Sequence, residues 1–186
     1  MNSVDVAGYV VRGIRADEWE RVKELRLVAL RDPAAPLAFL ETYEKAAAEE
    51  DGFWRNRAAM AGEGATTARQ FVAEAADGSW VGSVTVLMEQ PDSVDWSGQP
   101  VERRQGHVVG VFVQDGHRGH GLIQALLAAA AAWTWEQKAE RVRLWVHEDN
   151  VRAQAAYKRA GFVPTGLVVP FPTDETASEL EFALDR

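Results

Sequence analysis

The chain has 186 residues, is 47% hydrophobic, and carries a formal net charge of −8 from 20 basic and 28 acidic residues. This length and composition predict one globular domain over residues 1–186, and the acidic balance argues against nucleic-acid binding, which needs a basic face. Because the chain has no cysteine, a disulfide framework, a thiolate metal site and a cysteine nucleophile are excluded.

The N-terminal third is predicted to form one strand and then helices. Residues 9–14 read as a strand, and Asp17 is a candidate N-cap for a helix that continues to about Leu30. The segment 32–36, DPAAP, breaks that helix. A second helical stretch then continues towards Met60, so helices precede the main run of strands.

Two strands and a long polar segment come next. Residues 70–75 and 80–88 flank an Asp-Gly-Ser turn and predict a hairpin. Residues 89–106 contain two prolines, two glycines and several polar residues, which predicts a loop. Loops of this length in a compact domain are often functional. A flap over a substrate site and a mobile hairpin tip both stay open.

A glycine-rich turn separates a predicted central strand from a long helix. Residues 107–113 are apolar on both faces, as in a strand covered on both sides, and Gly110 predicts a bulge or a close backbone approach. The helix is expected over about 118–140. Its N-terminus offers unpaired N–H groups and the positive end of the helix dipole, the features of a phosphate site. The spacing of the glycines at 116, 119 and 121 excludes a dinucleotide fingerprint and a P-loop.

The segment 141–166 predicts a strand, a turn, a short helix and a further strand. Apolar and other side chains alternate over 141–146, which is typical of a half-buried strand. Asn150 stands at a helix N-cap position and Gly161 at the C′ position after the last turn. A final hairpin is expected to end in a strand over 179–185.

Two of these segments resemble the signatures of the GCN5-related N-acetyltransferase (GNAT) family. Arg118 and Gly121 match the [QR]-x-x-G-x-[GA] loop that binds the acetyl-CoA pyrophosphate, but Ile123 stands where the family has Gly or Ala. Residues 150–162 match N-x-x-A-x-x-x-Y-x-x-x-G-F at all five fixed positions. The resemblance covers about 70–186 well and the N-terminal third loosely. It implies an α/β (α+β) fold: a mixed, mostly antiparallel central sheet of six to seven strands, splayed in the middle and flanked by about four helices.

The resemblance also implies an N-acetyltransferase that moves an acetyl group from acetyl-CoA to a primary amine by direct attack in a ternary complex. A backbone N–H near Val111 to Val113 would stabilise the oxyanion, and the amides from Arg118 to Ile123 would bind the pyrophosphate. The expected acetyl-CoA residues are Val111, Phe112, Val113, Arg118, Gly119, His120, Gly121, Leu122, Ile123, Asn150 and Arg159. The candidates for the acceptor pocket are Phe39, Tyr43, Trp54 and Trp96.

Three residues are candidates for catalysis: Tyr157, Asn150 and His107. Tyr157 follows Asn150 by seven residues, about two helical turns, so both side chains point the same way; Tyr157 is expected to protonate the leaving thiolate. His107 is expected to act as the base, because an imidazole with a pKa near 6.5 accepts a proton at neutral pH. Glu89, at the end of the neighbouring strand, is the alternative base. A purely structural, hydrogen-bonded His107 also stays open.

Several further expectations concern partners and location. A non-catalytic relative that binds acyl-CoA as a regulator is the alternative function, and Ile123 keeps it open. No metal is expected, because His117 and His120 have no Cys or acidic partner in a ligand pattern. No apolar run approaches the roughly 20 residues that cross a membrane, and the N-terminus lacks a signal pattern, so a cytoplasmic protein is expected. An aminoglycoside-like drug, a polyamine, an amino acid and a protein amine all stay open as acceptors, as does a homodimer.

Overall fold

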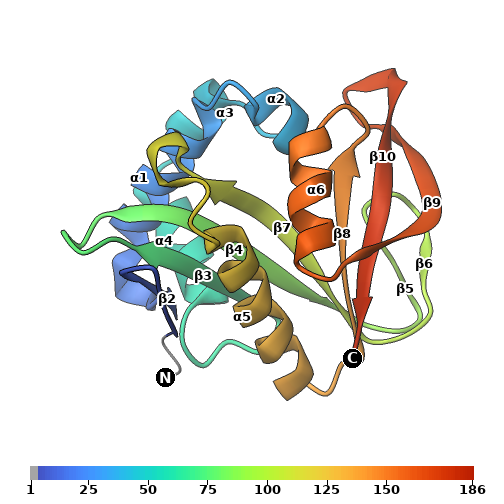
Figure 1. Ribbon diagram of the computed structural model, residues 1–186, viewed down its shortest axis with the longest axis horizontal. Coiled ribbons are helices and arrows are strands. Elements are labelled where there is room, and N and C mark those ends of the chain that lie inside the picture. Colours follow the sequence, from blue (N-terminus) through green and yellow to red (C-terminus); the bar gives the residue numbers. More distant parts are fainter. Residues whose placement is uncertain (1–3) are drawn as a thin grey trace.

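The computed structural model describes residues 4–186 and contains a mixed sheet whose strand order departs from the chain order (Figure 1). The order across the sheet is β1 (Val4–Val6), β2 (Tyr9–Gly13), β3 (Ala68–Glu74), β4 (Trp80–Glu89), β7 (Gln105–Val113), β8 (Arg141–His147), β10 (Asp174–Asp185) and β9 (Val163–Phe171). Every neighbouring pair is antiparallel except β7 and β8, which are parallel. The mixed, mostly antiparallel sheet is therefore confirmed.

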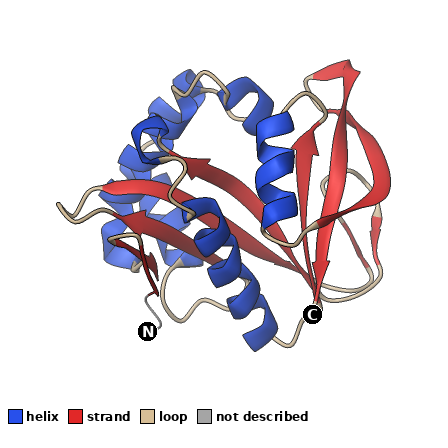
Figure 2. Cartoon of the chain, viewed as in Figure 1, coloured by secondary structure: helices blue, strands red, loops and turns tan. Residues whose placement is uncertain are grey.

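Helices cover both faces of this sheet (Figure 2). They are α1 (Trp19–Leu30), α2 (Ala35–Ala38), α3 (Tyr43–Ala47), α4 (Asp51–Ala61), α5 (Leu122–Glu136) and α6 (Val151–Arg159), with short 3-10 turns at Ala16–Glu18 and Asp115–His117. Apolar side chains of α5 and Tyr157 of α6 belong to one core cluster with the sheet. Side chains of α1, α3 and α4 form a second cluster on the opposite face.

The element counts exceed the expectation for two local reasons. Within residues 4–186 the main sheet has eight strands, because the short β1 adds an edge strand that the sequence pattern did not indicate. The second predicted helix is divided into α3 and α4, and the short α2 begins within the segment 32–36 that was predicted only to break the first helix, which raises the number of α-helices in the described chain to six. The helix expected from residue 118 begins instead at Leu122, since Gly119 and Gly121 have φ angles of +82° and +77° that lie outside the helical range.

The sheet splays between β7 and β8, as expected. The two strands pair only over Gly106–Val108 and Val142–Leu144, although both continue beyond this point. The backbone N–H and C=O groups on the β8-facing edge of residues 109–113 therefore have no strand partner. This opening lies in the middle of the sheet, where the ends of several elements converge.

The bulge predicted at Gly110 is confirmed. Between the pairs Ser83–Phe112 and Thr85–Val109, two residues of β7 stand against one of β4, and Gly110 has a φ of +63°. The extra residue reverses the alternation of the strand. Val108 and Val113 both join the α5 cluster, while Phe112 joins the cluster on the other face.

The prediction of a half-buried β8 is wrong at one residue. Arg143 is only 4% exposed, because its guanidinium bonds to three carboxylates, those of Glu89, Asp95 and Glu181. Asp95 comes from the predicted 89–106 loop, which folds into the small hairpin β5 (Ser93–Val94) and β6 (Pro100–Val101). That loop is thereby attached to the sheet by a buried ion pair with an N–O distance of 2.7 Å.

Helix lengths and hydropathy bear on one further expectation. Among residues 4–186, no helix combines the length and the apolar character needed to cross a membrane.

Candidate functional site

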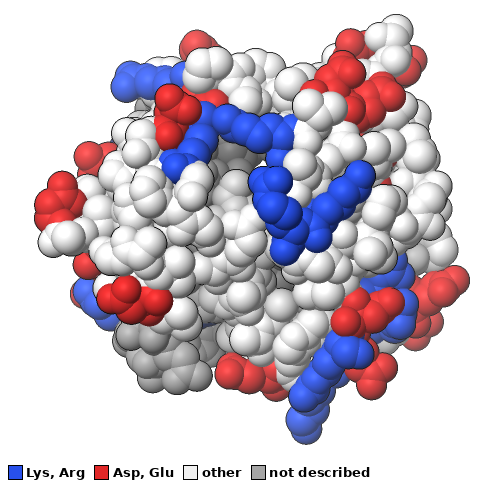
Figure 3. All heavy atoms as spheres, in the orientation of Figure 1, with Lys and Arg blue, Asp and Glu red and all other residues white. Residues whose placement is uncertain are grey.

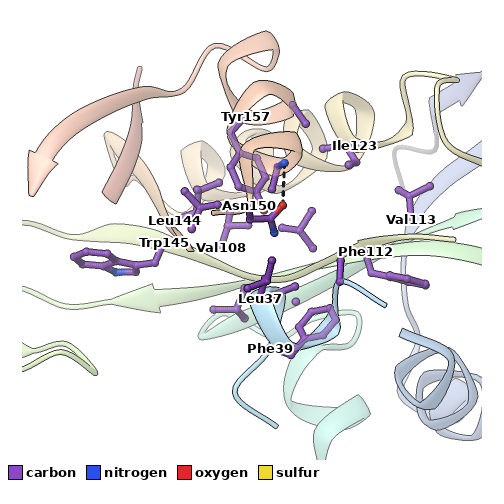
Figure 4. A pocket seen from close by; sticks show the side chains of 18 of the residues that line it. Leu37, Phe39, Val108, Phe112, Val113, Ile123, Leu144, Trp145, Asn150 and Tyr157 are labelled. Carbon is purple, nitrogen blue, oxygen red and sulfur yellow. Dashed lines mark hydrogen bonds between the residues drawn. The ribbon is translucent and has the colours of Figure 1, made fainter. Parts of the chain in front are cut away.

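A cavity of about 1230 Å³ occupies the splay and extends to both faces of the sheet (Figure 4). Figure 4 shows Asn150 and Tyr157 on one side of it and Leu37 and Phe39 on the other. On the face of the sheet that α5 covers, the β7–α5 loop and α6 form the cavity wall. The opposite side comes from the α1–α2 region, the end of β4, the β5 hairpin and Trp145 of β8.

The β7–α5 loop presents a row of free backbone N–H groups. Residues 119–124 donate none of their backbone N–H groups to a backbone carbonyl, whereas Ala125 donates to the Gly121 carbonyl at 3.0 Å. A Cβ added to Gly119 would meet no atom within 4 Å, and one on Gly121 would meet only Val6 Cγ1, at 3.9 Å. Both glycines are required by their positive φ angles rather than by crowding. Free N–H groups at the start of the 15-residue helix α5 can bind an anion.

The side chain of Arg118 is held by protein atoms. Its Nε donates to the Val113 carbonyl at 2.9 Å, Nη1 contacts Asp115 at 2.6 Å, and Nη2 contacts Asp32 at 2.5 Å. Its backbone N–H donates to the Asp115 carbonyl. Arg118 therefore ties the loop to β7 and to the α1–α2 region, and its guanidinium is already bonded to protein atoms.

The other loop residues divide between the cavity and its surroundings. Leu122 and Ile123 line the cavity, and Ile123 also packs against the α5 core cluster. The Ile123 side chain thus lies on the packing face of α5. Its backbone N–H is one of the N–H groups of the first helical turn that have no backbone partner. His120 does not line the cavity; its ring lies beside Tyr9, with 5.8 Å between ring centroids.

Two arginines of α6 were missed or only partly anticipated from the sequence. Arg152 and Arg159 both line the cavity, are exposed, and have no ion pair or hydrogen bond within the described chain. Figure 3 shows basic side chains at the edge of the hollow between the regions of α2 and α6. Arg159 was a candidate; the seven-residue spacing of Arg152 from it was the signal that could have identified the second one.

At the start of α6, Asn150 caps the helix as predicted. Its Oδ1 accepts from the Ala153 N–H at 3.2 Å, so the side-chain NH₂ remains as the polar group with no protein partner in residues 4–186 (Figure 4). Tyr157 lines the same cavity, is 7% exposed, and its hydroxyl also has no protein partner in that range. Burial, with a smaller contribution from Glu179, raises the pKa of Tyr157 further above its usual value. The phenol is therefore neutral at pH 7.

His107 lies at the closed end of the splay. It stands opposite Leu87 and Arg143 in the sheet, so it shares their face, and its Nδ1 lies 3.2 Å from Glu89 Oε1. Burial by itself would raise the pKa of Glu89, but hydrogen bonds from His107 and Arg143 outweigh it and lower that pKa to about 2. Glu89 is thus a carboxylate that orients His107, and both line the cavity.

Two of the four aromatic candidates for the acceptor pocket line the cavity. Phe39 and Trp96 line the cavity, whereas Tyr43 and Trp54 do not. Trp54 is fully buried in the α1–α4 cluster. The sequence pattern did not indicate Trp145, whose ring meets Trp96 edge to face with centroids 5.6 Å apart.

Glu179 of β10 also lines the cavity and had no signal in the sequence. It stands opposite His147 in the sheet, and its carboxylate has no ion pair or hydrogen bond among residues 4–186. Burial raises the pKa of Glu179 to about 7.

In the described chain, no three or more His, Asp or Glu side chains gather in a way that could hold a metal ion.

Comparison with known proteins gives consistent matches. The model of the Acetyltransferase (GNAT) family matches residues 19–162. An aminoglycoside N(6')-acetyltransferase type 1 from Stenotrophomonas maltophilia is 35% identical over 101 residues, which cover 54% of this chain and 63% of the relative, less than two thirds of its length.

Solved structures extend the match to the whole fold. A ribosomal-protein-S5-alanine acetyltransferase from Vibrio fischeri superposes with a TM-score of 0.74 at 16% identity, covering 100% of this chain and 97% of the other. A nourseothricin acetyltransferase gives a TM-score of 0.53 at 28% identity, over 64% and 65% of the two chains.

Proposed function

The chain belongs to the GNAT acetyltransferase family, and from this premise we propose that it transfers an acetyl group from acetyl-CoA to a primary amine. The amine attacks directly in a ternary complex. The observation that carries the proposal is the row of unpaired N–H groups at residues 119–124, which opens onto the same cavity as Asn150 and Tyr157.

The residues on the α5 side of the cavity fit acetyl-CoA. The free N–H groups of 119–124 would bind the pyrophosphate, and the unpaired Arg152 and Arg159 would pair with its other phosphate oxygens. The open edge of β7 over Val111 to Val113 supplies backbone groups for the pantetheine arm and an N–H for the thioester oxygen. The free NH₂ of Asn150 lies on the same wall.

In the proposed reaction the amine nitrogen forms a bond to the thioester carbon and the carbon–sulfur bond breaks. Tyr157 donates its phenolic proton to the thiolate that leaves. His107, oriented by Glu89, accepts the proton that the amine loses. An amine with a pKa of about 10.4 requires about 4.6 kcal/mol to free its lone pair at pH 7, which is why a base is needed.

Acetyl-CoA binding to the loop is tested by glycine variants in calorimetry. Gly121→Ala forces a side chain into a left-handed conformation, which costs about 1–2 kcal/mol. We expect it to weaken acetyl-CoA binding by about tenfold. Gly116→Ala is the matched control, because Gly116 has no positive φ and open space around its Cβ position. Equal affinities for the two variants would contradict the assignment of the loop.

Turnover is tested by detecting free CoA with a panel of primary amines. Release of CoA that depends on the amine supports the transferase. Tight acetyl-CoA binding without release for any amine would instead identify a non-catalytic, acyl-CoA-binding relative.

A further inference from the structure

Resting on the proposed function, we infer that the acceptor is a small primary monoamine with an apolar body, and that its ammonium group pairs with Glu179 on entering the cavity, before the nitrogen moves to His107 and loses its proton.

Four carboxylates line the cavity, and three are already paired: those of Asp32, Glu89 and Asp95. Asp32 bonds to Arg118, while Glu89 and Asp95 bond to Arg143. In the described chain Glu179 is the remaining one, with neither an ion pair nor a hydrogen bond. Among residues 4–186, a single cationic group would therefore pair with the last free carboxylate of this cavity.

Glu179 also lies on the side of the sheet where an acceptor would enter. It stands beside His147 on the face that carries Trp145 and Arg143, because alternate residues of β8 share a face. This face is opposite to the one that α5 covers. Burial raises its pKa to about 7, and a bound ammonium would supply the counter-charge that burial leaves missing.

The cavity that Glu179 lines also carries exposed apolar side chains, which offer no hydrogen-bond acceptors to a polycation. Of the 11 large hydrophobic side chains that are exposed in residues 4–186, four line this cavity: those of Leu40, Leu87, Val94 and Trp96. Exposed apolar side chains that line a cavity favour the binding of an apolar group. The edge-to-face pair of Trp96 and Trp145 adds a flat aromatic surface on the same side.

A polycationic acceptor fits these groups poorly. A second ammonium would find its carboxylate already bound to Arg118 or Arg143, and the free charges elsewhere on the wall are the cations of Arg152 and Arg159. Each unpaired ammonium taken from water carries a desolvation cost. The cavity thus favours one ammonium on an apolar body over a polyamine or an aminoglycoside.

The test compares 2-phenylethylamine with spermidine and kanamycin in the CoA-release assay, using the full chain and saturating acetyl-CoA. We expect kcat/KM for 2-phenylethylamine to exceed that of either polycation at least tenfold. Glu179→Gln should raise the KM for 2-phenylethylamine at least tenfold and change the KM for acetyl-CoA less than twofold. Glu175→Gln, on the exposed part of the same strand and outside the cavity, should leave both constants unchanged.

The outcomes distinguish a wrong acceptor class from a wrong proposed function. Faster turnover of spermidine or kanamycin, or an unchanged amine KM in Glu179→Gln, overturns the acceptor class and leaves the acetyltransferase intact. No CoA release with any of the three amines overturns the acceptor class, and the proposed function is overturned only if the wider panel of primary amines also gives no release. Circular dichroism of both variants verifies that each is folded.

Discussion

Replacing Arg143 with methionine tests the charge cluster that supports the acceptor side of the cavity. The guanidinium is 4% exposed and bonds to Glu89, Asp95 and Glu181 at N–O distances of 2.7–2.9 Å. Methionine fills similar space but leaves Glu89 and Asp95 buried without their arginine, while Glu181 keeps only its bond to Arg141. Breaking a buried ion pair by removing one partner costs about 3–5 kcal/mol, a large share of the roughly 5–15 kcal/mol that stabilises a domain.

The pH dependence of this loss follows from the carboxylates. The folded-state pKa of Glu89 is lowered to about 2 from the ordinary value of 4.5, so its contribution to stability is complete above about pH 4.5 and is lost as the pH falls towards 2. The difference between wild type and Arg143→Met should therefore be largest at pH 7 and clearly smaller at pH 3.

Urea denaturation followed by tryptophan fluorescence at the two pH values measures this difference. Arg103→Met is the control, because Arg103 makes only an exposed contact with Asp185 at 3.6 Å, and exposed pairs contribute about 0–1 kcal/mol. A loss at pH 7 below about 1 kcal/mol for Arg143→Met, or one that is equal at both pH values, would refute the reasoning.

Three shorter predictions concern α6 and β10. Asn150→Ala removes the acceptor of the Ala153 N–H and should lower the free energy of unfolding by about 0.5–2 kcal/mol in thermal denaturation; no change would show that the cap contributes nothing. Tyr157→Phe should lower kcat for CoA release about 100-fold while calorimetry finds acetyl-CoA affinity within twofold, and full turnover would exclude the proton donor. Burial raises the pKa of Glu179 to about 7, so its ionisation penalises folding increasingly from about pH 4.5 to 7. Glu179→Gln should accordingly raise Tm at pH 8 and not at pH 4, and an equal shift at both values would count against a desolvated carboxylate.

Local signals in the sequence account for the elements that were predicted well. The Asn150 cap, the Gly110 bulge and the glycines at 119 and 121 each depend on the conformation or hydrogen bonding of one or two neighbouring residues, and the structure has each of them. Glycine is needed where φ is positive, so these positions can be read without knowledge of the fold. The β3–β4 hairpin was readable for the same reason.

The strand β8 shows where local patterns end. Alternation predicted Arg143 on a solvated face, but Glu89, Asp95 and Glu181, at sequence separations of 54, 48 and 38 residues, surround it in the folded chain. Periodicity records which side of a strand a residue occupies. It does not record what covers that side.

By itself the sequence determined the glycine turn before α5, the capped helix that follows β8 and the family to which both point, because these depend on backbone conformation within a few residues. Only the tertiary structure decided which charged groups of the cavity are free. Arg118 is paired with Asp32, 86 residues away, and Arg143 is paired with carboxylates from three other segments. Among residues 4–186, Glu179 is left as the unpaired carboxylate of the cavity. Charge pairing is a property of distances in space, and those are set by the sheet order and the splay between β7 and β8.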